Sequence, residues 1–299
     1  MVRGRGGRAL RMADGRIRVL GRLVALLVVG GMLAGGVLLD IYGRGETEKS
    51  STVGDTRLPD RVDLDVSLRR VDPSSGELTL TVLPAPVGAP AEDEGELTPK
   101  DDLDIYTSSR HTGVLHYQAG APISLREISF DLTGGTVTDY PLDHYSPYIE
   151  FSAETGGHQV PVTMEFTNHD QDFRSTLRPA KIQSGITGAL VRLSRSPGTL
   201  ILAALMMASA WGLALAVLGA ATLVVGQRRG LVWGALGWMA ATLFALVGFR
   251  NTAPGAPPIG VFMDYAAFFW SELIIAVSVV YVAWCGVRVE RRGPGAGRT

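Results

Sequence analysis

The sequence predicts a membrane protein of the α + β class. It has four transmembrane helices and an extracytoplasmic antiparallel β-sandwich, immunoglobulin-like in form, between the first and second helices. Hydrophobic residues make up 46% of the 299 residues and charged residues 19%, but the two kinds are segregated along the chain. Within residues 45–195, several stretches alternate apolar and polar side chains, as half-buried strands do. Together these patterns are typical of a membrane protein that carries a soluble domain.

The first predicted transmembrane helix covers residues 23–42, after a basic tail, residues 1–22, that holds seven arginines. Its apolar run with its flanks reaches the length of about 20 residues that a membrane-spanning helix needs. A cleaved signal peptide is the competing interpretation, given the basic start and the glycine-rich end. The run is long for a signal peptide and no clean A-x-A site follows it, so we expect an uncleaved anchor.

Three further spans are predicted in a bundle at residues 199–287. They cover residues 199–225, 231–249 and 265–287, and each is long enough to cross a bilayer. Arg228 and Arg229 lie between the first two spans, and residues 288–299 form a tail with four arginines. Because loops rich in arginine stay in the cytoplasm, we expect both termini to be cytoplasmic. Residues 45–195 and the loop 250–264 then lie outside.

Six stretches of residues 45–195 alternate apolar and polar side chains in the pattern of half-buried strands. They are residues 62–68, 78–82, 128–132, 149–153, 160–166 and 189–193. Turn-forming sequences separate them, so seven or eight short antiparallel strands in two sheets are expected. Because proline cannot donate a hydrogen bond within a sheet, we expect the strand around Pro161 either to lie at a sheet edge or to start near this residue. Residues 83–100 are rich in proline and then acidic, which predicts a mobile loop.

The charge and motif content argue against several classes of function. Residues 45–195 hold 24 acids and 13 bases, a net charge of −11, and phosphate backbones bind basic surfaces, so no nucleic-acid partner is expected. The five histidines match no metal-binding spacing, and there is no G-x-S-x-G or phosphate-binding loop. We therefore predict no catalytic residue, no metal and no cofactor, and we do not expect an enzyme.

The densest polar and aromatic run of the soluble domain is DYPLDHYSPY, residues 139–148. Tyr140, Asp143 and Tyr145 in this run are candidate binding residues. They form either the rim of a binding site or a buried corner that fixes the sandwich. We prefer the corner, because buried tyrosine hydroxyls commonly anchor the strands of such folds.

The loop at residues 250–264 is the second candidate site, with Arg250, Asn251, Pro257 and Pro258 on the outer face. Proline fixes the backbone dihedral φ, so this loop is stiffer than its length suggests. It either docks the soluble domain or a partner, or simply returns the chain to the membrane.

Two acids follow this loop in the last span. Asp264 lies at the start of the helix, where it caps the first turn or binds a ligand. Glu272 lies eight residues further on, ~12 Å deeper at the rise of a helix. A carboxylate at that depth either forms hydrogen bonds with hydroxyls such as those of Thr242 and Ser209, or it binds a proton or a ligand.

Two motifs carry a family resemblance: YPLDHY at residues 140–145 and RNTAPGAPPIGVFMDYAAFFW at residues 250–270. Over residues 50–290 the chain resembles an uncharacterised actinobacterial membrane-protein family, domain of unknown function 4436. The positions that match most plainly are Pro141, Asp143, Pro257, Pro258, Gly260 and Asp264. The resemblance implies a bacterial plasma-membrane location with the β domain facing the cell envelope, and it implies no activity.

These observations predict a non-catalytic binding or accessory component of a cell-envelope complex. Its expected partners are the lipid bilayer and either an envelope membrane protein or a second copy of the chain. The alternative is a small transport or proton-coupled function centred on Glu272, with Arg250 and Asp264 at its mouth.

Overall fold

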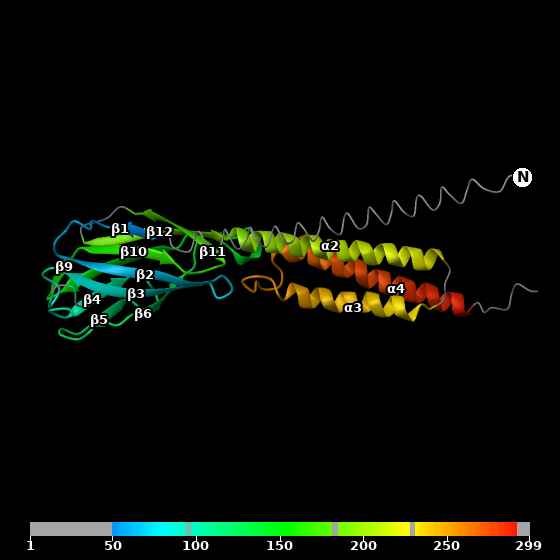
Figure 1. Cartoon of the computed structure of the whole chain (residues 1–299), viewed down its shortest axis with the longest axis horizontal. Helices are drawn as coiled ribbons and strands as arrows, with labels where there is room; N and C mark the ends of the chain where they lie inside the picture. Colours follow the sequence, from blue (N-terminus) through cyan, green and yellow to red (C-terminus); the bar gives the residue numbers. More distant parts are fainter. Residues whose placement is uncertain (1–49, 94, 96, 181–184, 228–230, 292–299) are drawn as a thin grey trace, which may run out of the picture. The chain divides into compact units, whose positions relative to one another are not determined.

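The computed structural model describes residues 50–93, 95, 97–180, 185–227 and 231–291. Within these residues a β-sandwich comes first and three long apolar helices follow (Figure 1). The predicted order of a sandwich and then three apolar helices is confirmed. The predicted first helix and both terminal tails lie outside the described residues, and the immunoglobulin-like form stays a prediction.

The sandwich consists of two sheets. The first sheet has the order β1-β10-β2-β3-β6, and the second has the order β11-β12-β8-β4-β5, with β7 on β12 and β9 on β8. The strands of the first sheet are β1 (Ser51–Val53), β2 (Arg61–Asp72), β3 (Glu77–Val87), β6 (Arg126–Asp131) and β10 (Val162–Asn168). Those of the second are β4 (Leu103–Thr107), β5 (Val114–Tyr117), β7 (His144–Tyr145), β8 (Tyr148–Thr155), β9 (His158–Val160), β11 (Phe173–Pro179) and β12 (Ile186–Arg195).

All six stretches with an alternating pattern overlap a strand, and their apolar residues form the core between the sheets. The phenyl rings of Phe130 and Phe151, from opposite sheets, meet edge to face with centroids 6.0 Å apart. Burial of such side chains stabilises the folded state by about 25 cal/mol for each Å² of apolar surface that is removed from water. This core is what fixes which face of each strand points outward.

The prediction of a purely antiparallel sandwich is wrong at one pair, because β2 and β10 run parallel. The chain changes sheets at Pro161, between β9 of the second sheet and β10 of the first. A strand that enters by such a crossover can run in either direction, and alternation of side chains carries no information about direction. Pro161 precedes the first residue of β10, which is one of the two positions predicted for it.

The predicted mobile loop at residues 83–100 is wrong in its first part, because β3 continues to Val87. Pro84 and Pro86 are buried and lie opposite Leu64 and Val62 of β2. The pairing of β3 with β6 ends at Val82, so the next stretch of β3 has a neighbour on one side only among the described strands. Proline is tolerated on such an edge because no ladder hydrogen bond is lost.

The helices are α2 (Pro197–Gly226), α3 (Trp233–Arg250) and α4 (Phe269–Arg291), with a π-helical turn, η2 (Asp264–Phe268), before α4. Each is long and apolar enough to cross a membrane, when α4 is taken together with η2. The Ser196 hydroxyl accepts a hydrogen bond from the Thr199 amide (3.3 Å) and caps α2. Since β12 ends at Arg195, Ser196 alone separates the sandwich from α2.

Candidate functional site

A buried ion pair lies where the sandwich meets α2. Arg195, the last residue of β12, donates from Nε to Oδ1 of Asp143 (2.9 Å) and from Nη2 to Oδ2 (3.0 Å). The Tyr145 hydroxyl donates to the same Oδ2 (3.0 Å). The side chains of Arg195 and Asp143 are only 1% and 0% exposed. Two parallel hydrogen bonds of this kind fix the relative orientation of both groups.

Aromatic rings enclose the guanidinium group of Arg195. Its Cζ lies 4.1 Å from the centroid of Phe173 and 4.9 Å from that of Tyr140, within the range of cation–π attraction. Its Nη1 has no hydrogen-bond partner among the described residues. A Cβ atom at Gly255 would lie 2.6 Å from this Nη1, and Gly255 has φ of +70°. Glycine therefore allows the 250–264 loop to pack directly against Arg195.

Tyr140 connects the sandwich to the 250–264 loop. Its hydroxyl donates to the carbonyl of Pro254 (3.0 Å), and its own carbonyl accepts from the amide of Met263 (3.3 Å). The side chain is fully buried, and it packs in the apolar cluster of the helices and the loop rather than in the sandwich core. The sandwich thus docks on the loop through Tyr140, whose side-chain hydroxyl and backbone carbonyl are both hydrogen-bonded to it.

A second buried ion pair folds the loop itself. Arg250, at the end of α3, donates from Nε to Oδ1 of Asp264 (2.8 Å) and from Nη2 to Oδ2 (2.7 Å). The same guanidinium donates to the carbonyls of Pro257 (2.9 Å) and Pro258 (2.7 Å). The Gly260 amide donates to Asp264 Oδ2 (2.8 Å). Arg250 therefore satisfies the acid and two loop carbonyls at once, because its planar fork carries five donors.

We call the set of Tyr140, Asp143, Arg195, Arg250 and Asp264 the joint, since it holds the sandwich, the loop and the helices together. Its members come from three stretches of the chain: the run at residues 139–148, the end of β12 and the 250–264 loop. All five are buried. No group of three or more His, Cys, Asp or Glu side chains suited to a metal ion occurs in the part of the chain that the structure describes.

Comparison with known families divides the chain at the start of the helices. Residues 52–194 match the model of Domain of unknown function (DUF4436). Residues 195–289 match a separate model, Domain of unknown function (DUF8686). None of the curated proteins compared with the chain matches it.

The DUF4436 resemblance seen in the sequence is confirmed, but the family model stops before the helices. The motif at residues 250–270 lies in the DUF8686 region instead. The joint spans the two regions: Tyr140 and Asp143 belong to the DUF4436 region, and Arg195, Arg250 and Asp264 to the DUF8686 region.

The structure places most of the predicted site residues in or around the joint. Tyr140, Asp143 and Tyr145 gather around Arg195, whereas Pro257, Pro258 and Asp264 gather around Arg250. Asn251 is exposed and forms the C-cap of α3 through its backbone. Glu272 lies apart from both groups, in a groove of its own.

Arg195, Phe173 and Gly255 were not predicted from the sequence. Arg195 had a detectable signal, because it continues the alternation of the buried residues Ala189, Val191 and Leu193 by one more step. A charged residue on the inward face of a strand requires a buried partner. Phe173 and Gly255 reach Arg195 only through the folded chain, so spacing could not have identified them.

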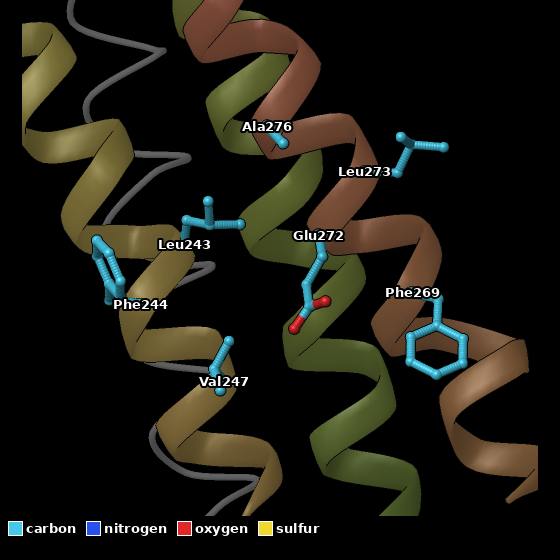
Figure 2. Close-up of a pocket in the computed structure, with 7 residues that line it drawn as sticks. All are labelled: Leu243, Phe244, Val247, Phe269, Glu272, Leu273 and Ala276. Carbon is cyan, nitrogen blue, oxygen red and sulfur yellow. The ribbon is translucent and has the colours of Figure 1, made fainter. Parts of the chain in front are cut away.

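Glu272 lines an open groove of about 460 Å³ between α3 and α4, whose other lining residues are apolar (Figure 2). Leu243 and Val247 come from α3 and lie on the side of that helix toward Glu272. Of the two alternatives for Glu272, hydrogen bonds to the hydroxyls of Thr242 and Ser209 are not formed, and the Thr242 hydroxyl instead donates to the carbonyl of Trp238 in its own helix (2.9 Å). Glu272 is half-buried, and among the described residues it has no hydrogen-bond or ion-pair partner.

The tyrosines around the joint make stability sensitive to alkaline pH. Burial raises the pKa of Tyr140 to about 12, and burial with the adjacent Asp143 carboxylate raises the pKa of Tyr145. The unfolded chain releases these protons from about pH 10, so between there and about pH 12 the folded state binds more protons than the unfolded state. The free energy of unfolding therefore falls as pH rises through this window.

The measurement is the free energy of unfolding of the full chain by pulse proteolysis in denaturant across that pH window. Replacing both Tyr140 and Tyr145 with phenylalanine should flatten the decline. Tyr265→Phe, an exposed tyrosine, is the control and should leave the decline unchanged. An equally steep decline in the double variant would contradict this assignment.

Proposed function

We propose that this chain is a non-catalytic binding or accessory component of a bacterial cell-envelope complex. It is anchored in the plasma membrane by four helices, with both termini in the cytoplasm and residues 45–195 outside. The distribution of arginine along the sequence supports this orientation. The three long apolar helices of the structure are compatible with it.

The joint is the observation that carries the proposal. The polar and aromatic residues best suited to chemistry are bonded to one another and buried, so they hold the domains in place instead of meeting a substrate. A sandwich fixed in this way presents its outer surface at a set height and angle above the bilayer. Such preorganisation lowers the entropic cost of binding a partner.

Crosslinking in intact cells followed by purification in mild detergent tests this proposal. A stoichiometric protein partner, or a second copy of the chain, is expected to co-purify. Asp143→Ala, which breaks the joint, should reduce recovery of the partner at equal expression, whereas Glu92→Ala on the exposed surface should not. Purification of the chain as a monomer, with no crosslinked or co-purified protein, would contradict the proposal.

A second candidate function is supported by Glu272. A half-buried carboxylate without a described partner, lining an open apolar groove of about 460 Å³ between two helices, is the kind of group that takes up a proton or a cation during transport. Proton uptake into proteoliposomes under an imposed potential tests this function. Glu272→Gln should abolish uptake while Glu290→Gln, at the far end of α4, preserves it. Equal uptake in wild type and Glu272→Gln would remove this candidate.

A further inference from the structure

A polar pocket of about 500 Å³ opens on the outer face of the second sheet, next to β7 and β12. The side chains that give it its chemistry are His144, Ser146, Thr176, Arg192 and Ser194. It lies outside the joint and shares only the strands that carry it. We propose that this pocket binds a phosphate ester. The inference goes beyond the proposed partner-binding role and does not depend on it.

The strand register explains why these side chains converge. Arg192 lies opposite Thr176 of β11, and Ser194 lies opposite His144 of β7. Leu193 lies between Arg192 and Ser194 in β12 and is buried in the sandwich core. Because successive side chains of a strand point to opposite faces, the neighbours of Leu193 must face outward.

The pocket offers hydrogen-bond donors and positive charge without a carboxylate. Its lining includes one guanidinium, one imidazole and three hydroxyl groups. The nearest acid in the sequence, Asp143, is turned into the interior, where it pairs with Arg195. Arg192 forms no ion pair with any described residue.

This local charge is unusual in a domain with 24 acids and 13 bases. A phosphate group presents several acceptor oxygens, which an arginine fork and nearby hydroxyls match in geometry and charge. A carboxylate ligand would leave part of this donor set unused. The lining therefore favours a phosphate ester over a simple acid.

The position of the pocket places it near the surface of the predicted bilayer. Arg192 is four residues from Ser196, the N-cap of α2, which is about 13 Å along a strand. At the same end of the sandwich, Leu142 directly precedes the joint residue Asp143 and is 65% exposed. Ile259, in the loop that contacts Tyr140, is 76% exposed. Exposed apolar side chains of this kind suit the boundary between headgroups and hydrocarbon.

Phospholipid headgroups occupy roughly 5–8 Å on each side of the hydrocarbon core, so a lipid phosphate reaches the pocket only where the first turn of α2 is itself sunk into the headgroup layer. A soluble phosphate ester of the envelope offers the same chemistry. Both sources share the group that the pocket binds, and an experiment can distinguish them.

Native mass spectrometry of the full chain in detergent tests the proposal, with phosphatidylglycerol and phosphate-free diacylglycerol as probes. The wild type should retain phosphatidylglycerol selectively. Arg192→Gln should weaken retention about tenfold, as expected for loss of a charge-assisted bond, and His144→Asn should weaken it less. Arg178→Gln is the matched control, since Arg178 is an exposed arginine of β11 opposite Leu190 and outside the pocket.

Glycerol phosphate added in solution separates the two sources. If it displaces the lipid, or binds the wild type but not Arg192→Gln, the pocket accepts soluble esters. If the lipid stays bound, the pocket is specific for the membrane. Retention of both lipids alike together with no binding of glycerol phosphate, or equal losses in Arg192→Gln and Arg178→Gln, would overturn the proposal.

Discussion

Replacing Asp143 with alanine should lower the free energy of unfolding by about 3–5 kcal/mol, the usual result of removing one partner of a buried ion pair. Arg195 would remain as a buried cation without its carboxylate, because its side chain is 1% exposed. Its Nη1 already lacks a hydrogen-bond partner among the described residues. The Tyr145 hydroxyl would lose its acceptor as well. Pulse proteolysis of the full chain in denaturant measures this change.

The double variant Asp143→Leu with Arg195→Met is the matched control. It removes both charges and fills the space with apolar side chains, so it should recover most of the lost stability. It should not restore the orientation that the two parallel hydrogen bonds impose. A single variant as stable as wild type, or a double variant less stable than the single one, would contradict the buried-charge explanation.

Replacing Arg250 with methionine should have an effect of the same size, about 3–5 kcal/mol. Asp264 would keep the Gly260 amide as a donor but lose the guanidinium. The carbonyls of Pro257 and Pro258 would lose their donors at the same time, so the loop would lose the contacts that fold it. Hydrogen exchange of the full chain measures this directly, through faster exchange of the amides of Gly260 and Met263.

Two further variants sharpen this prediction. Arg250→Lys keeps the charge but not the planar fork, so an intermediate loss of protection is expected. Arg291→Met, at the exposed end of α4, should leave exchange in the loop unchanged. Wild-type exchange in Arg250→Met would show that the loop is held by other contacts.

Much of the fold could be predicted from local patterns in the sequence. The six alternating stretches overlap strands, and three apolar runs match α2, α3 and α4. These features depend on which face of each element is buried, and side-chain period reports that. The parallel pairing of β2 and β10 could not be predicted, because it depends on how the chain crosses between sheets.

The candidate site shows the same division. Tyr140, Asp143, Arg250 and Asp264 were selected from their residue types, but their partners were not. Asp143 pairs with a residue 52 positions away, a separation that no local motif encodes. The alternative in which Glu272 contacts Thr242 failed because similar depth in the bundle does not ensure that two side chains face each other.

The sandwich is docked on the 250–264 loop through Tyr140. Leu142 and Ile259 are exposed, and each lies within four residues of one partner of the hydrogen bond between Tyr140 and Met263. The most direct test is in-cell crosslinking of Leu142→Cys with Ile259→Cys by a short bismaleimide, in a Cys285→Ala background. Val114→Cys with Ile259→Cys is the control, since Val114 lies in β5, away from the loop in Figure 1. Efficient crosslinking of the first pair alone is the predicted result. No crosslink in the first pair, with both cysteines accessible to labelling, would contradict docking and leave the sandwich independent of the helices.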